Sequence, residues 1–176
     1  MHYQSWMTIT LFVGPMCSGK TSALIEQYDL YKDHYPIFIY LPSVDTRSKL
    51  YLKSHDGRQL HAQCVDNVRC LPADCCVLID EVQFTTGHVL DLLKTVPRNT
   101  DVFLSGLSGD FRRRGWPGME DIMALCDEVF FLKAKCTGCG EAAPFTVRKG
   151  NSTDLVVCGG TEMYEPRCRH CIDRTI

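Results

Sequence analysis

Residues 14–21 read Gly-Pro-Met-Cys-Ser-Gly-Lys-Thr and fit the pattern G-x-x-x-x-G-K-[ST] of a phosphate-binding loop. Residues 8–13, just before the loop, are rich in β-branched and aromatic side chains, which is typical of a strand. Leu24, Tyr28 and Tyr31, after the loop, have the spacing of one helix face. A helix that begins at such a loop directs backbone N–H groups at an anion, so the sequence predicts binding of nucleotide phosphates. A chance glycine turn is the alternative, which the flanking strand and helix disfavour.

Two side chains of this loop have expected roles in binding ATP and Mg²⁺. Lys20 would reach the β- and γ-phosphates, and the hydroxyl of Thr21 would hold Mg²⁺. The complete predicted set for ATP and Mg²⁺ is Gly14, Pro15, Met16, Cys17, Ser18, Gly19, Lys20, Thr21, Arg47 and Asp80. Cys17 lies near a helix N-terminus, where the pKa of a thiol can fall and make it sensitive to oxidants. A buried, unreactive cysteine explains this position equally well.

Composition limits the classes of protein to consider. The 176 residues include 19 Lys and Arg against 21 Asp and Glu, a formal charge of −2, which argues against binding to a nucleic-acid backbone. No apolar run approaches 18 residues and the first residues do not resemble a signal peptide, so we expect a cytoplasmic protein that is not in a membrane. Eleven cysteines, an odd number, favour reduced thiols and metal binding over a disulfide framework.

Strands and helical stretches alternate up to about residue 134. Apolar runs predict buried strands at residues 36–41, 75–79, 102–104 and 129–132. Residues 89–96 and 119–126 have helical spacing, and residues 48–74 suggest short strands around a turn at 56–57. We therefore expect an α/β fold of the P-loop NTPase type, with a mostly parallel sheet and helices on both faces, in a domain spanning residues 1–134.

Polar residues follow the ends of the predicted strands. In such sheets ligands bind at the carboxyl ends of the strands, so the phosphate loop and residues 45–47, 80–81 and 106–111 should meet in one crevice. Asp80 would hold Mg²⁺ or its water. Glu81 would be the general base. Side chains alternate along an extended segment, so the Glu81 side chain would point away from that of Asp80. The alternative for both is a solvated strand end.

Aromatic residues also follow these strands. Phe84, Phe111 and Trp116 would suit a planar ring, although each taken alone could equally be part of the core.

Four cysteines near the C-terminus form two C-x-x-C pairs: Cys136, Cys139, Cys168 and Cys171. Two such pairs complete a closed tetrahedral Zn²⁺ site, which is structural rather than catalytic. A redox or disulfide pair is the alternative. We expect residues 135–176 to be a small zinc-binding domain, with a hairpin of residues 146–148 and 155–157 around Gly150-Asn151.

Taken together, these motifs resemble the P-loop, zinc-bearing thymidine kinases found in cells and in large DNA viruses. The resemblance covers nearly the whole chain, in the family's order. It rests on GPMxSGK at 14–20, DTRS at 45–48, SHDG at 54–57, IDExQF at 79–84, GLxGDFR at 106–112, FTxR at 145–148, GGxExY at 159–164 and CRxC at 168–171.

The resemblance implies a specific reaction and its partners. The γ-phosphoryl group of ATP would pass to the 5′-hydroxyl of thymidine, and of deoxyuridine, with Glu81 as base and Lys20 as the second catalytic residue. Segment 145–164 would form a lasso-like loop over the base, and the protein would be a homo-oligomer, commonly a tetramer. The implied nucleoside-binding residues are Met16, Phe84, Leu107, Phe111, Trp116, Thr146 and Tyr164.

Three positions depart from the family pattern. Cys17 occupies a position that is commonly aromatic or small, Ser108 replaces an aspartate, and Trp116 precedes Pro117 where the family has R-x-P-F. We expect the bulkier Trp116 to affect which bases and nucleoside analogues the site accepts.

Two other functions were weighed. The main alternative is a P-loop ATPase whose zinc module binds nucleic acid, against which the negative charge argues. The other is a catalytically silent relative, against which the intact Lys20, Thr21, Asp80 and Glu81 argue.

Overall fold

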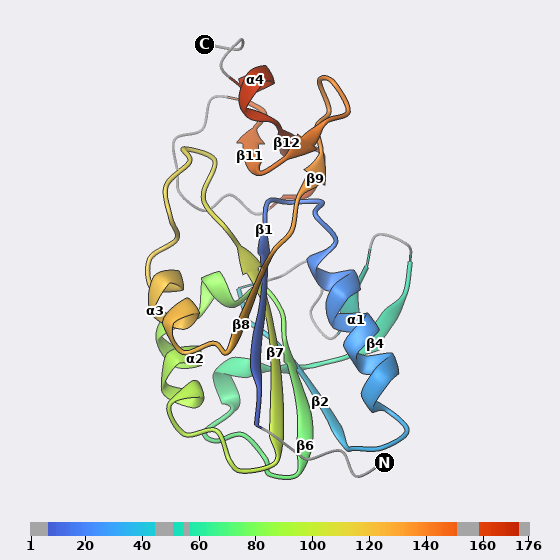
Figure 1. Cartoon of the computed structure of the whole chain (residues 1–176), viewed down its shortest axis with the longest axis vertical. Coiled ribbons are helices and arrows are strands. Elements are labelled where there is room, and N and C mark those ends of the chain that lie inside the picture. Colours follow the sequence, from blue (N-terminus) through green and yellow to red (C-terminus); the bar gives the residue numbers. More distant parts are fainter. Residues whose placement is uncertain (1–6, 45–50, 55–56, 151–158, 173–176) are drawn as a thin grey trace.

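The computed structural model of the chain describes residues 7–44, 51–54, 57–150 and 159–172. Its centre is a six-stranded sheet in which every pairing is parallel (Figure 1). Across the sheet the strands are β5 (Gln63–Cys64), β2 (Ile37–Leu41), β6 (Cys75–Ile79), β7 (Thr100–Leu107), β1 (Ile9–Gly14) and β8 (Glu128–Phe131). The predicted α/β fold with a mostly parallel sheet is confirmed.

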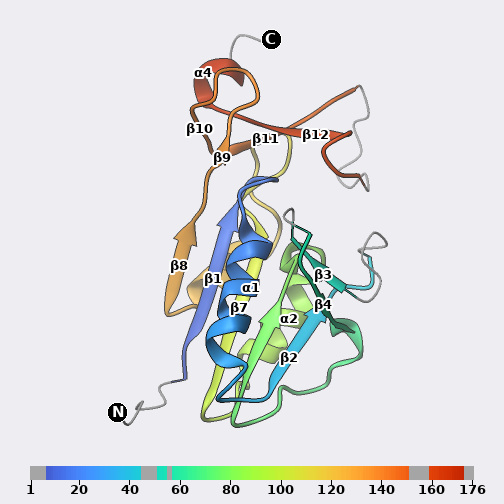
Figure 2. The same ribbon diagram turned by 90° about the vertical axis from the view of Figure 1, so that its right-hand side faces the viewer.

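Helices cover both faces of this sheet (Figures 1 and 2). Helix α1 (Lys20–Tyr31) packs on one face, and helices α2 (Thr86–Leu93) and α3 (Met119–Ala124) lie against the other. Every residue of β1 and of β6 is buried, as expected for strands covered on both faces. This burial explains why both strands read as near-continuous apolar runs in the sequence.

The predicted strands agree with the observed ones to within a few residues. The largest difference is at β7, which extends three residues beyond the predicted 102–104 on its C-terminal side. Between β2 and β6 the chain forms the antiparallel pair β3 (Tyr51–Lys53) and β4 (Gln59–His61), followed by the 3₁₀ turn η2 (Val65–Asn67). Gly57 has a φ of 88°, which fits the predicted turn, while Asp56 lies outside the described residues.

The C-terminal segment forms a small unit above the carboxyl ends of the sheet strands (Figure 1). Its elements are β9 (Ala134–Lys135), β10 (Ala142–Ala143), β11 (Phe145–Arg148), β12 (Tyr164–Arg167) and the short helix α4 (Arg169–Ile172). The partner predicted for β11 was wrong. β11 pairs with β12, with Arg148 opposite Tyr164, and Lys149 N donates to Met163 O at 2.7 Å. The connection is therefore much longer than a Gly150-Asn151 turn, and residues 155–157 lie outside the described part.

Candidate active site

The phosphate loop depends on glycine at two of its positions. Gly19 has a φ of 83°, the left-handed conformation that glycine adopts without strain, at the residue before α1. A Cβ on Gly14 would lie 2.6 Å from the carbonyl oxygen of Leu132, so only glycine fits against that backbone. Lys20, the first residue of α1, is buried, and its Nζ donates to Pro15 O at 2.6 Å. The loop therefore wraps around the Lys20 ammonium group.

Cys17 is in this loop but lacks the features of a reactive thiol. It is half-buried, has a φ of 62°, and packs against the buried residues around the C-terminal cysteines. Burial raises the pKa of the Cys17 thiol, and the nearby Lys20 only partly opposes that effect. The hypothesis of a lowered pKa is therefore wrong, because burial outweighs the charges of Lys20 and Lys149.

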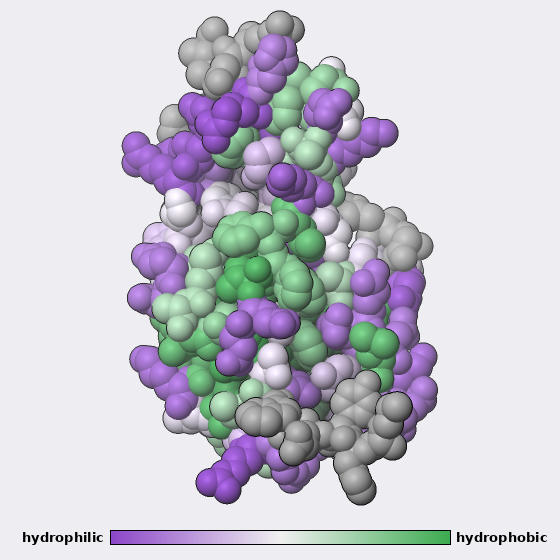
Figure 3. Space-filling view, in the orientation of Figure 1, coloured by the Kyte–Doolittle hydropathy of each residue, from purple (hydrophilic) through white to green (hydrophobic). Residues whose placement is uncertain are grey.

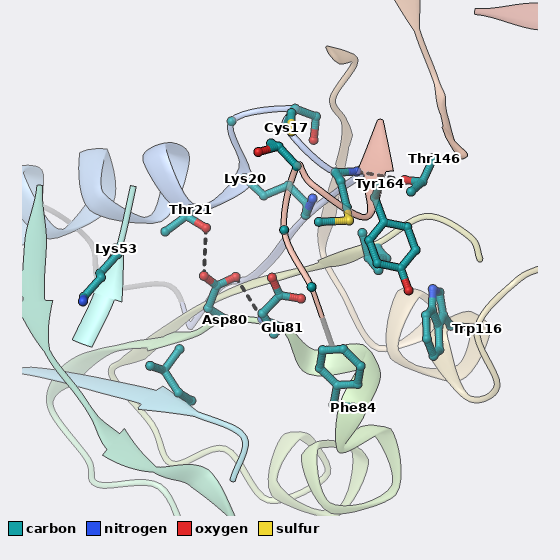
Figure 4. A pocket seen from close by; sticks show the side chains of 18 of the residues that line it. Cys17, Lys20, Thr21, Lys53, Asp80, Glu81, Phe84, Trp116, Thr146 and Tyr164 are labelled. Carbon is teal, nitrogen blue, oxygen red and sulfur yellow. Dashed lines mark hydrogen bonds between the residues drawn. The ribbon is translucent and has the colours of Figure 1, made fainter. Parts of the chain in front are cut away.

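Asp80 follows β6 and lies directly beside the phosphate loop (Figure 4). Its Oδ2 accepts from Thr21 Oγ1 at 2.9 Å, and its Oδ1 accepts from the Ser105 hydroxyl and from Glu81 N, the latter at 2.9 Å. Burial raises the pKa of the Asp80 carboxyl although these hydrogen bonds lower it, and burial lowers the pKa of the Lys20 ammonium. Asp80 is 5% exposed, so it is not a solvated strand end.

Glu81 has an unusual backbone for a residue with a side chain. Its φ of 54° and ψ of 39° are left-handed, at the start of the 3₁₀ turn η3 (Val82–Phe84). Gln83 Nε2 donates to Glu81 Oε2, and Gln83 Oε1 accepts from Leu107 N at 3.0 Å. In the sequence Gln83 is visible only as one letter of the D-E-x-Q-F motif, so its contacts could not be inferred there.

Aromatic side chains form one wall of the site. The rings of Phe84 and Trp116 meet edge to face, with centroids 5.8 Å apart and an interplanar angle of 73°. Trp116 is 7% exposed, and its indole Nε1 is buried without a hydrogen-bond partner among the described residues. Such a donor is costly to leave unpaired.

Arg148 joins two further wall residues that come from different parts of the chain. Its guanidinium carbon lies 3.8 Å from the ring centroid of Phe111, and its Nη2 donates to Tyr164 Oη at 2.8 Å. Asp110 shapes the loop that carries Phe111, because its Oδ1 accepts from the backbone N–H of Arg112 and of Arg114, both at 2.8 Å. Arg148 was not predicted as a site residue, and Asp110 was expected only as part of segment 106–111 at the crevice, although both occur in the family-like motifs.

The phosphate loop also contacts the C-terminal unit directly. Met16 N donates to Thr146 Oγ1 at 2.9 Å, across 130 residues of sequence. The Thr146 hydroxyl, expected only to line the pocket for the nucleoside, therefore holds the phosphate loop as well.

A single cavity of about 260 Å³ contains most of the predicted site residues. Those that line it are Met16, Cys17, Ser18, Gly19, Lys20, Thr21, Asp80, Glu81, Phe84, Leu107, Phe111, Trp116, Thr146 and Tyr164. Gly14 and Pro15 support the loop from behind and do not line the cavity. Arg47 lies outside the described residues. The crevice expected at the strand ends is thus present, with phosphate-loop residues at one end and aromatic residues at the other (Figure 4).

The four C-terminal cysteines converge on one point. Their sulfur atoms all lie within 4.8 Å of one another, and none is in a disulfide with another described cysteine. The pKa of Cys136 is lowered to about 6, first by the backbone N–H of Cys168 and further by that of Gly138. Hydrogen bonds with the other thiols, first that of Cys139, raise the pKa of Cys171 to about 12. A divalent cation would favour all four as thiolates, so the cluster can hold a metal ion such as zinc.

The phosphate loop and the aromatic wall share this cavity, so the fold and site define a kinase of the P-loop class. The family model described as thymidine kinase matches residues 7–172, and the chain belongs to the thymidine kinase family. None of the described helices has the length and apolarity that crossing a membrane requires.

Several bacterial proteins named thymidine kinase are similar over nearly their whole length. The one from Roseiflexus sp. (strain RS-1) is 32% identical over 182 residues, which cover 94% of each chain. The one from Bacteroides fragilis (strain ATCC 25285) is 31% identical, over 96% of this chain and 88% of its own. The one from Mycoplasma mobile is 32% identical, over 93% of this chain and 86% of its own.

Proposed function

We propose that the protein transfers the γ-phosphoryl group of ATP to the 5′-hydroxyl of thymidine, giving dTMP and ADP, and accepts deoxyuridine as well. One observation carries this proposal: the Glu81 carboxylate lines the cavity that holds both the phosphate-loop side chains and the aromatic wall. In the step, Glu81 takes the proton of the 5′-hydroxyl while its oxygen attacks the γ-phosphorus, and ADP leaves.

The donor end of the cavity suits a nucleotide that carries Mg²⁺. The Thr21 hydroxyl and an Asp80 carboxylate oxygen lie 2.9 Å apart, and oxygen ligands of this kind are those that Mg²⁺ prefers. These two residues would hold Mg²⁺, which neutralises phosphate charge when bound. Lys20 would turn from Pro15 O, to which its Nζ donates at 2.6 Å, toward the β- and γ-phosphates.

The acceptor end suits a flat pyrimidine ring. Phe84 and Trp116, whose rings meet edge to face, would flank it. The methyl group would lie among Met16, Leu107 and Thr146, all of which line the cavity. Phe111 and Tyr164, joined by Arg148, would close the remaining side.

The remaining proposals concern the protein as a whole. We propose Zn²⁺ as the ion of the four-cysteine cluster, residues 1–134 and 135–176 as the two domains, and a cytoplasmic location where ATP is available. Edge strand β8 exposes Phe130 and Phe131, which are 46% and 67% accessible. Figure 3 shows an apolar patch on the face of the molecule where β8 lies. Covering these rings would favour association of copies, which supports a homo-oligomer such as a tetramer. Light scattering would measure the subunit number.

The test of the reaction is a nucleoside panel with MgATP and purified protein. We expect phosphorylation of thymidine and deoxyuridine, and no stimulation of ATP hydrolysis by DNA. Glu81→Gln, which keeps the shape but removes the base, should lower kcat by roughly 10²- to 10⁴-fold while thymidine still binds. An inactive wild-type protein would reject the proposed reaction, and near-normal turnover by the variant would reject Glu81 as base.

A further inference from the structure

Gln83 lies between the proposed base and the end of strand β7. The side chain is almost fully buried, with 5% of the residue exposed. Its amide nitrogen donates to Glu81 Oε2, and its amide oxygen accepts from the backbone N–H of Leu107 at 3.0 Å. One side chain therefore bridges the carboxylate and the backbone of a neighbouring strand.

The contact with Leu107 determines which way the amide faces. A backbone N–H can only donate, so the Gln83 oxygen must face Leu107 and the NH₂ group must face Glu81. The amide cannot rotate by 180° without turning its NH₂ toward that N–H and leaving both groups without acceptors. Strand β7 thus fixes a hydrogen-bond donor against the Glu81 carboxylate.

Gly106 provides the space that this arrangement needs. A Cβ at this position would lie 3.0 Å from Met119 Cε, 3.0 Å from Val82 Cγ2 and 3.2 Å from Gln83 Oε1. All three contacts are tight, so a larger residue would crowd the space that the Gln83 amide shares with these two side chains. Glycine at position 106 therefore leaves room for the Gln83 side chain beside β7.

The backbone of Glu81 makes such support necessary. Its left-handed conformation is unfavourable for a residue with a Cβ and persists only where neighbours maintain it. Asp80 Oδ1 accepts from the Glu81 N–H at 2.9 Å, which holds the backbone, and Gln83 holds the carboxylate. Figure 4 shows the carboxylate directed into the cavity, between Lys20 and Phe84.

We propose that Gln83 is a positioning residue for phosphoryl transfer. By binding one carboxylate oxygen of Glu81, it keeps the carboxylate in the orientation that receives the proton of the acceptor hydroxyl. This inference rests on the proposed function, in which Glu81 is the base. Gln83 itself contacts neither substrate nor nucleotide in this role, so its loss should lower kcat and leave nucleoside binding nearly unchanged.

The test compares Gln83→Glu with Gln83→Leu. At a pH where both carboxylates are ionised, the glutamate keeps an acceptor for Leu107 N–H but places a repelling acceptor against Glu81. Leucine removes both contacts. Gln63→Glu, at an exposed glutamine of edge strand β5, controls for the added charge. We expect both Gln83 variants to lose roughly 10- to 100-fold in kcat, with the KM and the calorimetric Kd for thymidine within about threefold of wild type.

The outcomes distinguish the positioning role of Gln83 from the proposed kinase reaction. If Gln83→Glu matches Gln63→Glu in kcat while Gln83→Leu is impaired, Gln83 only anchors η3 to β7 and the positioning role is wrong. If Gln83→Glu does not fold, Gln83→Leu decides alone, and it should lower kcat at constant KM; a normal kcat would overturn the inference. A wild-type protein that does not phosphorylate thymidine rejects the proposed function instead, whatever the variants do.

Discussion

Replacement of Arg148 by methionine should weaken thymidine binding, because Arg148 holds two cavity walls together. Methionine keeps much of the side-chain length but removes both the guanidinium stack on Phe111, at 3.8 Å, and the 2.8 Å hydrogen bond to Tyr164 Oη. A desolvated cation–π pair contributes about 2 kcal/mol and a hydrogen bond from a charged group about 1.5–3 kcal/mol. The buried guanidinium group also costs desolvation energy, which offsets part of this sum.

A net loss of about 2 kcal/mol corresponds to a roughly 30-fold rise in the Kd for thymidine. The loss should appear in binding because Phe111 and Tyr164 would then have to be ordered when the nucleoside enters. Isothermal titration calorimetry measures the Kd directly. The melting temperature of the free variant shows whether weaker binding comes instead from a general loss of stability.

Arg169→Met is the matched control. Arg169 lies 5.0 Å from the Phe145 ring, is exposed, and does not line the cavity, so its replacement should leave Kd unchanged. A Kd for Arg148→Met within about threefold of wild type would refute the reasoning, and so would an equal loss in the control.

Three further predictions follow from the site. Trp116→Ala removes one side of the aromatic wall, so it should bind thymidine roughly tenfold more weakly in calorimetry; an unchanged Kd would exclude Trp116 as a wall of the nucleoside pocket. Cys168→Ser should lower metal content, measured by mass spectrometry, together with the melting temperature, and full metal occupancy with normal stability would contradict the cluster assignment. Iodoacetamide should label half-buried Cys17 roughly tenfold more slowly than exposed Cys70 in peptide mapping; equal rates would be inconsistent with the raised pKa.

The parts of the site that the sequence predicted follow from local patterns. The carboxyl ends of parallel strands meet at one edge of a sheet, so Asp80 and Glu81 had to lie near the phosphate loop once the alternation of strands and helices was recognised. The C-x-x-C spacing similarly implied that the four cysteines would converge. Both arguments need only local patterns and a known fold class.

The parts that the sequence did not predict depend on contacts between distant side chains. Gln83 and Leu107 are 24 residues apart, and no local pattern indicates that a backbone N–H of one strand needs the amide of another element. The thiol of Cys17 was misjudged for the same reason, because its burial comes from the C-terminal unit. The partner of β11 was misassigned because Gly150-Asn151 resembles a tight turn, although the ladder begins again only at residue 164.

The hydrogen bond from Met16 N to Thr146 Oγ1 has a consequence for how the protein matures. During synthesis, the phosphate loop is made well before its partner, which follows 130 residues later. A nascent chain that ends before β11 can form the strand and helix around the loop, yet it lacks one of the contacts that fix it. The ability to bind nucleotide should therefore be completed late, after the C-terminal unit has folded onto the sheet, which limits nucleotide binding by unfinished chains.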